Sequence, residues 1–102
     1  MRRFFVDTFY WIALFSVRDR WHRWVMAFDE TLDATDQLYT TDEVLTEFLT
    51  YYSTATPRLR TRVARYVQTL LNTPGLTVIP QSRAGFLQAF NQTAQTHIWR
   101  SS

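Results

Sequence analysis

Apolar residues in this chain follow two different spacings. Short continuous runs at residues 4–6 and 76–79 are typical of strands covered on both faces, and residues 37–40 form a weaker third candidate. Longer stretches with an apolar residue every three or four positions predict helices over residues 8–17, 19–34, 42–52 and 57–72, with a last helix after Ser82. Strands that alternate with helical connections predict an α/β fold built on a short parallel sheet.

Polar residues mark where several of these helices begin. Thr8 can cap the first helix through its hydroxyl, and Thr56-Pro57 places a capping residue before a proline at the first helical position. Thr40-Thr41-Asp42-Glu43 matches a capping box, in which a threonine hydroxyl and Glu43 satisfy backbone N–H groups reciprocally. These signals predict sharp helix starts directly after the first two strands.

The second predicted helix is amphipathic. We expect its apolar stripe to face the core, and this stripe consists of Trp21, Trp24, Val25, Phe28 and Leu32. Its acids are expected to form a solvated face with the residues that follow, namely Asp29, Glu30, Asp33 and Asp36.

Composition narrows the class of protein. The chain has 102 residues, enough for one domain, and its hydrophobic fraction of 46% and aromatic fraction of 17% argue against disorder. It has no cysteine, which excludes disulfides and thiolate metal sites and fits a cytoplasmic protein. The uncharged segment over residues 8–17 is shorter than the roughly 20 apolar residues that span a bilayer, so no membrane partner is expected.

Charge is distributed unevenly along the chain. All 9 acids lie within residues 1–47, whereas residues 48–102 carry six arginines and no acid. Carboxylate chemistry must therefore come from the first half, and attraction for nucleic acid is expected from the second. Arg58, Arg62 and Arg65 share one arc of their helix, which fits either a solvated cationic face or a surface that contacts RNA phosphates.

Polar residues follow the predicted strands at their carboxyl ends. In a parallel sheet these ends share one edge, and ligands bind there. Asp7 follows the first strand, Thr40-Thr41 ends the second, and Glu47 lies on the second turn of the next helix. Asp7 and Glu47 are therefore expected to face one pocket.

The residue types leave two interpretations of these acids open. Asp7 fits a cap that the dipole of the following helix favours, and it also fits a ligand for a hard cation such as Mg²⁺ or Mn²⁺. Glu47 lies at the margin of an apolar stripe, so it fits either a solvated position or a second ligand. No Ser/His/Asp arrangement and no Gly-rich phosphate loop offers another chemistry, since Gly occurs only at positions 75 and 85.

Two segments resemble the motifs of PIN-domain nucleases. Phe5-Val6-Asp7-Thr8-Phe9-Tyr10-Trp11-Ile12-Ala13-Leu14 is similar to the first motif of that family. Tyr39-Thr40-Thr41-Asp42-Glu43-Val44-Leu45-Thr46-Glu47-Phe48-Leu49 is similar to the second, where a strand ends in Thr-Thr and the helix carries an acid before an apolar pair. The order of elements also matches, over about residues 3–95. Bacterial members of this type are VapC-like toxins, Mg²⁺- or Mn²⁺-dependent ribonucleases paired with an antitoxin.

The resemblance implies a fold, an activity and site residues. The fold would be a three-layer α/β/α PIN-like domain over residues 1–95, followed by a divergent tail over residues 96–102. Asp7 and Glu47 would be catalytic metal-binding acids, and Thr8 and Thr40 would line the site. Metal-activated water would hydrolyse RNA phosphodiesters. The implied partners are RNA and a cognate antitoxin protein.

The sequence departs from the family after Glu47. PIN domains carry a third acid, and often a fourth, beyond the helix that corresponds to residues 82–95, followed by another helix and strand. No Asp or Glu follows Glu47 here. We therefore expect a C-terminally truncated PIN domain with impaired nuclease activity, or alternatively a non-catalytic module that binds the antitoxin or RNA. A missing strand would expose a sheet edge, which favours association such as a homodimer.

Overall fold

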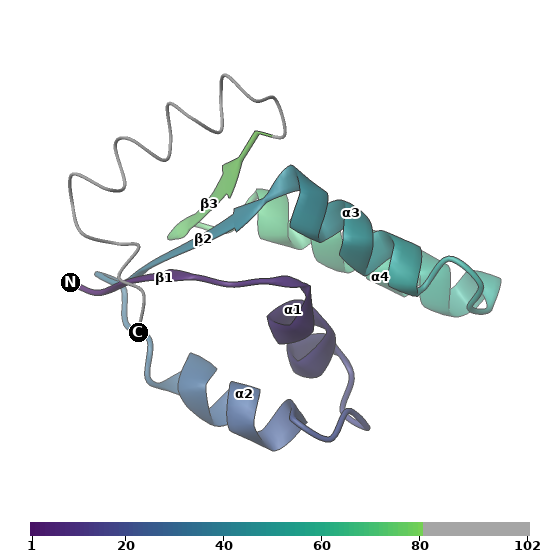
Figure 1. Cartoon of the computed structure of the whole chain (residues 1–102), viewed down its shortest axis with the longest axis horizontal. Helices are drawn as coiled ribbons and strands as arrows, with labels where there is room; N and C mark the ends of the chain where they lie inside the picture. Colours follow the sequence, from purple (N-terminus) through teal and green to yellow (C-terminus); the bar gives the residue numbers. More distant parts are fainter. Residues whose placement is uncertain (81–102) are drawn as a thin grey trace.

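Three parallel strands and four helices make up residues 1–80, the part of the chain that the structure, a computed structural model, describes (Figure 1). The elements are β1 (Arg3–Phe5), α1 (Thr8–Phe15), α2 (His22–Glu30), β2 (Gln37–Thr41), α3 (Asp42–Tyr51), α4 (Pro57–Leu71) and β3 (Leu76–Ile79). The predicted α/β class with a parallel sheet is confirmed. The expected helix after Ser82, the domain end at residue 95 and the tail at 96–102 lie outside the described residues.

The strands lie in sequence order, with β2 between β1 and β3. Phe4 pairs with Leu38, which pairs in turn with Leu76, so the apolar residues of the three strands share a face. The backbone N–H of Val6 continues the β1 pairing with a 2.8 Å bond to the carbonyl of Tyr39. Because all three strands are parallel, their carboxyl ends form one edge, and α1 and α3 both begin there.

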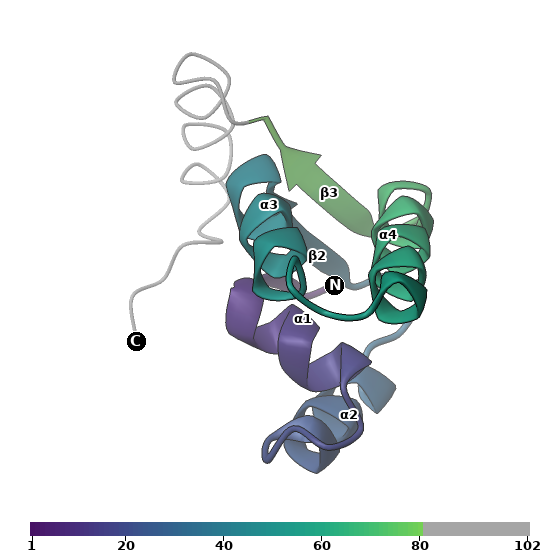
Figure 2. The ribbon, with the colours of Figure 1, turned by 90° about the vertical axis from the view of Figure 1, so that its right-hand side faces the viewer.

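The core forms where the helices pack together. Helix α1 packs against α2 and α3, α3 packs against α4 and β2, and α4 packs against β3 (Figure 2). Trp11, Phe48 and Val63 have 2%, 0% and 1% of their surface exposed, so α1, α3 and α4 each contribute a fully buried side chain at the centre. The ring of Phe15 meets the rings of Phe48, Tyr52 and Tyr66 edge-on, at centroid distances of 5.8, 5.4 and 5.1 Å.

Helix starts follow the predicted polar residues with two corrections. Asp7, not Thr8, caps α1, because its carboxylate accepts the backbone N–H of Tyr10. Thr41 caps α3 by accepting the N–H of Val44 at 3.0 Å, which places Glu43 at the second helical position. Glu43 is therefore one residue short of the position that a capping box requires. The predicted cap at Thr56 is confirmed, with Pro57 at the first helical position.

Helix α4 is the longest described helix and leads back to the sheet. It ends at Leu71, and the following turn passes through Gly75, whose φ of 86° lies in the left-handed region that glycine adopts without strain. The carbonyl of Gly75 then accepts the N–H of Leu38 at 2.8 Å, so the turn is joined directly to β2. Among the described residues no helix is both long enough and apolar enough to span a bilayer.

Helix α2 is shorter than the apolar periodicity predicts, and its aromatic residues face a different way. Val25 is buried and Phe28 is half-buried, as expected, but Trp24 is 75% exposed and Trp21 is 38% exposed. The helix begins only at His22, because residues before it form turns in which the Asp19 carboxylate accepts the N–H of Trp21. The prediction that both tryptophans belong to the core is wrong.

Asp36 is also placed differently from its prediction as part of a solvated face. It is 7% exposed and forms an ion pair with Arg2, whose Nη2 lies 2.8 Å from Oδ2. The carboxylate also accepts the backbone N–H groups of Arg2 and Asp33. Hydrogen bonds from Arg2 and Asp33 therefore lower the pKa of Asp36 well below its usual range. This pair fastens the loop before β2 to the amino end of β1.

Candidate metal centre

Asp7 lies at the carboxyl end of β1, where the chain turns into α1. Its extended backbone, with φ −104° and ψ −173°, directs the side chain over the start of the helix, and Oδ1 accepts the N–H of Tyr10 at 3.3 Å. Oδ2 has no hydrogen bond to any described residue, and the residue is exposed. The cap and the ligand interpretations are thus compatible, because the cap uses only one of the two oxygens.

Glu47 lies beside the residue that follows Asp7. The hydroxyl of Thr8 donates to Oε2 of Glu47 at 2.9 Å, and the same hydroxyl lies 3.5 Å from the carbonyl of Val44. A hydroxyl has one proton, and the shorter distance assigns that proton to the carboxylate. The packing of α1 against α3 therefore brings the two predicted acids to the same edge of the sheet, joined through Thr8.

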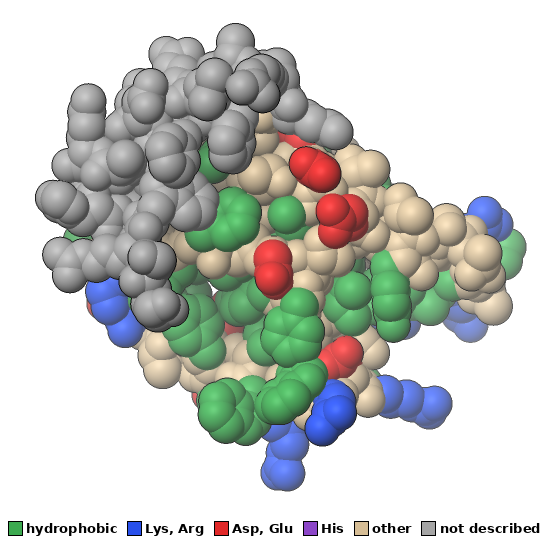
Figure 3. Space-filling model, viewed as in Figure 1, with side chains coloured by type: hydrophobic (Ala, Val, Ile, Leu, Met, Phe, Trp, Pro, Cys, Tyr) green, Lys and Arg blue, Asp and Glu red, His purple; other side chains and the backbone are tan. Residues whose placement is uncertain are grey.

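The two acids line different hollows, so the expectation that they face one pocket is not met. Asp7 lines a hollow of about 330 Å³ between β1 and α2, together with Phe4, Phe5, Val6, Tyr10 and Phe28. Glu47 lines a second hollow of about 390 Å³ on α3, together with Thr8, Glu43, Thr46, Thr50 and Tyr51. Acidic side chains gather at the centre of this face, over α3 and the end of β1 (Figure 3). Both carboxylates are exposed to solvent.

Thr40 lies in the core next to the Asp7 turn and does not line the site. It is fully buried, and its hydroxyl donates to the carbonyl of Val6 at 3.0 Å while accepting the indole N–H of Trp11 at 3.1 Å. These two bonds join β2, β1 and α1 directly beneath Asp7. The sequence signals for this network are the polar residue at the end of a strand and the indole four residues after Asp7.

Tyr10, on the first turn of α1, joins this helix to α2. Its hydroxyl donates to Oδ1 of Asp29 at 2.8 Å, so α1 is tied to α2. Burial, followed by the hydrogen bond to Asp29, raises the pKa of Tyr10 well above its usual range. Asp29 is thus a hydrogen-bond partner and not only a member of a solvated face. His22 has a comparable structural role, since its Nδ1 lies 2.7 Å from the carbonyl of Ala13.

The side-chain oxygen atoms at this edge are of the types that bind a hard divalent cation. Two exposed carboxylates and the Thr8 hydroxyl are the donor types that Mg²⁺ and Mn²⁺ prefer, and Mg²⁺ is commonly held by one or two carboxylates with waters and substrate phosphates. Within residues 1–80 no group of three or more His, Cys, Asp or Glu side chains is arranged to hold a metal ion. The two carboxylates and the Thr8 hydroxyl are therefore candidate ligands for a divalent cation.

The predicted arginine arc on α4 lies away from this edge. Arg58, Arg62 and Arg65 are exposed, and the guanidinium of Arg62 lies 5.6 Å from the ring centroid of Phe15. Phe15 ends α1, and eight residues of helix rise roughly 12 Å, so this contact is at the far end of α1 from Asp7.

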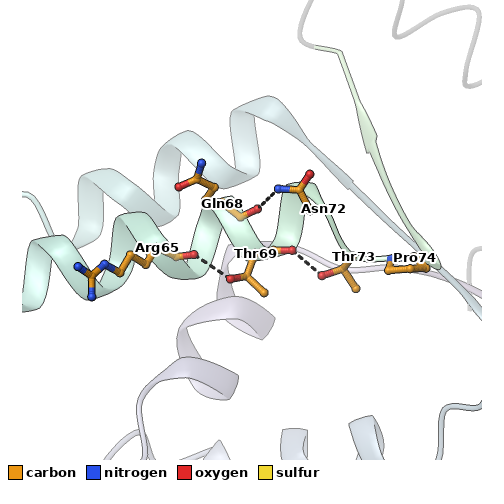
Figure 4. A pocket seen from close by; sticks show the side chains of 6 residues that line it. All are labelled: Arg65, Gln68, Thr69, Asn72, Thr73 and Pro74. Atoms are coloured by element: carbon orange, nitrogen blue, oxygen red, sulfur yellow. Dashed lines mark hydrogen bonds between the residues drawn. The ribbon is translucent and has the colours of Figure 1, made fainter.

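Arg65 belongs to a different surface again. It lines a shallow groove at the end of α4, where the side chains of Thr69, Asn72 and Thr73 bond back to the helix carbonyls (Figure 4). This end of α4 leads into the start of β3, which is the amino edge of the sheet. The structure thus places Asp7 and Glu47 at the same edge of the sheet, linked through Thr8, and leaves the three arginines of α4 elsewhere.

Comparison with known proteins adds no further assignment to this geometry. No protein-family model matches the chain, and no curated protein or solved structure matches it either.

Proposed function

We propose that this chain is a PIN-like, VapC-like endoribonuclease in which Asp7 and Glu47 hold Mg²⁺ or Mn²⁺. The observation that carries the proposal is the 2.9 Å hydrogen bond from Thr8 to Glu47, which joins the two motifs at the carboxyl edge of a parallel sheet. That edge is where ligands bind in open α/β sheets. The three-layer α/β/α form of the PIN domain belongs to the same proposal.

The proposed chemistry divides between the cation and the chain. A bound Mg²⁺ or Mn²⁺ lowers the pKa of its water and neutralises charge that develops on the phosphodiester. Asp7 supplies Oδ2 as a ligand while Oδ1 keeps the helix cap. Thr8 orients the Glu47 carboxylate, and the buried Thr40 hydroxyl holds the Val6 carbonyl in place directly before Asp7. Activity is weak in this proposal, because two carboxylates hold a hard cation only with the help of waters and substrate.

Partners and location follow from the same assignment. RNA is the substrate, a cognate antitoxin is the regulatory partner, a second copy of the chain is a further partner, and the compartment is the cytoplasm. These parts of the proposal rest on the motif resemblance in residues 5–14 and 39–49, together with the placement of Asp7 and Glu47.

The test is RNA cleavage with and without divalent cation. We expect weak cleavage in Mn²⁺, none in EDTA, and none by Asp7→Asn, since asparagine is as good a helix cap as aspartate but lacks the charge. Leu71→Ala, an exposed substitution on α4, serves as the control that keeps activity. Equal cleavage by wild type and Asp7→Asn would remove Asp7 from the mechanism.

A second candidate function is a non-catalytic module that binds RNA or the antitoxin. The observation in its favour is that residues 1–80 contain no three-ligand metal group. It predicts that RNA or antitoxin binding survives the combined Asp7→Asn and Glu47→Gln substitutions, in a chain that cleaves nothing in Mn²⁺. Loss of binding in that double variant, with the fold retained by circular dichroism, would contradict it.

A further inference from the structure

Three aromatic side chains are exposed next to the candidate metal centre. Phe9, Trp21 and Trp24 are 49%, 38% and 75% exposed. They form a continuous row, since the ring centroids of Phe9 and Trp21 are 6.2 Å apart and those of Trp21 and Trp24 are also 6.2 Å apart. Large exposed aromatic residues that lie together on one surface typically mark an interaction site.

The row is not explained by the core. Helix α2 packs through Val25 and Phe28, which leaves Trp24 on its outer side. Phe9 likewise lies on the outer side of α1, whereas its sequence neighbours Tyr10 and Trp11 are buried. Hydrophobic side chains gather over α1 and α2 on the same face as the central acids (Figure 3). The aromatic row is therefore available to a ligand that also reaches the acidic edge.

Arginines accompany the aromatic row. Arg18, Arg20 and Arg23 are exposed, and the guanidinium of Arg20 lies 5.0 Å from the ring centroid of Trp21. The single acid in this segment, Asp19, accepts the backbone N–H of Trp21 at 2.8 Å and belongs to the turn before α2. The segment is thus cationic around flat apolar rings, which complements a ligand that has both negative charge and flat faces.

Single-stranded nucleic acid has both of these properties. Its bases stack on exposed aromatic rings while arginines contact the phosphates, and the combination is typical of proteins that bind single strands. In a duplex the bases are stacked on one another and their faces are closed to protein side chains. Phe9 follows Asp7 by two residues at the start of α1, so one end of the row lies at the same end of this helix as the candidate ligand for the cation.

We propose that Phe9, Trp21 and Trp24, with Arg20 and Arg23, form a base-stacking platform that binds single-stranded RNA and leads it to Asp7. The choice of RNA over DNA rests on the proposed function, whereas the stacking itself rests on the exposed rings and the arginines beside them. The platform on α1 and α2, and not the arginine arc on α4, is then the principal RNA-binding surface.

The test measures RNA binding without cleavage. Fluorescence anisotropy with a labelled 12-nucleotide oligouridine in EDTA separates binding from metal chemistry. Trp24→Ala is expected to weaken binding about tenfold, and Trp24→Phe to retain most of the affinity, because a phenyl ring still stacks. Leu71→Ala removes a comparably exposed apolar side chain from α4 and is expected to leave the affinity unchanged.

Charge and strandedness supply independent readouts. Arg23→Gln is expected to make the plot of log affinity against log salt concentration less steep, by the amount that about one phosphate contact contributes. A duplex of the same length is expected to bind more weakly than the single strand. Equal affinity of wild type and Trp24→Ala, or equal affinity for duplex and single strand, would overturn the proposal. A change of oligomeric state in Trp24→Ala with unchanged RNA affinity would overturn it too, because the row would then be a protein interface.

The two proposals fail separately. If oligouridine binds in EDTA through Trp24 but no RNA is cleaved in Mn²⁺, the platform stands and the nuclease proposal fails. If Mn²⁺-dependent cleavage requires Asp7 but is unaffected by Trp24→Ala, the nuclease proposal stands and the platform fails.

Discussion

The two ends of strand β1 are each associated with an aspartate, and the surroundings of these two residues differ sharply. At the amino end Asp36 is buried, and both of its carboxylate oxygens accept hydrogen bonds from Arg2 or Asp33. At the carboxyl end Asp7 is exposed, and from the described residues its carboxylate accepts one hydrogen bond, from the backbone N–H of Tyr10 at 3.3 Å. The difference separates an acid whose bonding capacity is used within the fold from an acid that retains capacity for a ligand.

The same contrast applies to the threonines that follow the strands. Thr40 is buried and its hydroxyl both donates and accepts within the fold. Thr8 is half-buried and directs its proton to the exposed carboxylate of Glu47. Structural polar groups thus lie beneath the carboxyl edge of the sheet, and the candidate chemical groups lie on its surface.

The largest expected effect is on RNA cleavage, through the exposed Asp7 at the carboxyl end of β1. Asp7→Asn is expected to reduce Mn²⁺-dependent RNA cleavage at least about 1,000-fold, because the chain then lacks one of the two carboxylates proposed as metal ligands. The midpoint of urea unfolding should change little, since asparagine maintains the cap. Cleavage rates and unfolding curves of the same preparation check both parts. Wild-type cleavage by Asp7→Asn would contradict the inference that Asp7, unlike Asp36, is the aspartate that binds a ligand.

The second effect is on the stability of the buried network. Thr40→Val keeps the side-chain volume but leaves the Val6 carbonyl and the Trp11 indole N–H without their partner. We expect a loss of about 1–3 kcal/mol in the free energy of unfolding for each group that becomes unpaired. Chemical denaturation measures the loss, with Thr46→Val at an exposed position of α3 as the matched control. Similar stability of the two variants would show that the network is dispensable.

The third expected effect is on how the stability of the fold depends on pH, through the buried Asp36. The folded state lowers the pKa of Asp36, so its contribution to stability is fully present above the unfolded pKa of about 3.9 and is lost as the pH falls through the lower folded value. Asp36→Asn is therefore expected to be less stable than wild type at pH 7 and to lose less stability between pH 5 and pH 2. Glu30→Gln, an exposed change on α2, should reproduce the wild-type profile.

The smallest effect is expected at Thr8. Thr8→Val removes the hydrogen bond to Glu47 and should weaken cleavage about tenfold, as is usual when a group that orients a metal ligand is lost. Its effect on the free energy of unfolding should stay within about 0.5 kcal/mol, because the bond lies at the surface. Thr8→Ser retains the hydroxyl and should retain activity. Equal rates for the serine and valine variants would deny Thr8 a positioning role.

The sequence predicts the elements well where the signals are local. The β3 run at residues 76–79 and the Thr56-Pro57 helix start depend on neighbouring residues, and the structure reproduces both. The ion pair of Asp36 joins residues 34 positions apart, so no local pattern reveals it. Periodicity shows that α2 is amphipathic, but it does not show that α1 covers Val25 and leaves Trp24 in solvent.

The candidate site is predicted in part for the same reason. Parallel strands place Asp7 and the start of α3 on one edge, and this follows from strand order alone. The bond between Thr8 and Glu47 depends on how α1 packs against α3, which the sequence pattern does not specify. The burial of Thr40 is likewise a property of the packed sheet, and it overturns the expectation that this hydroxyl lines the site.

Manganese binding tests the central claim most directly, because it does not depend on activity. Titration of the chain with Mn²⁺, followed by electron paramagnetic resonance of the free ion, measures how many ions bind and how tightly. We predict one weak site in wild type, its loss in both Asp7→Asn and Glu47→Gln, and its retention in Glu30→Gln. Equal Mn²⁺ binding by wild type and the two site variants, or no binding by wild type, would contradict the assignment of Asp7 and Glu47 as a shared metal centre.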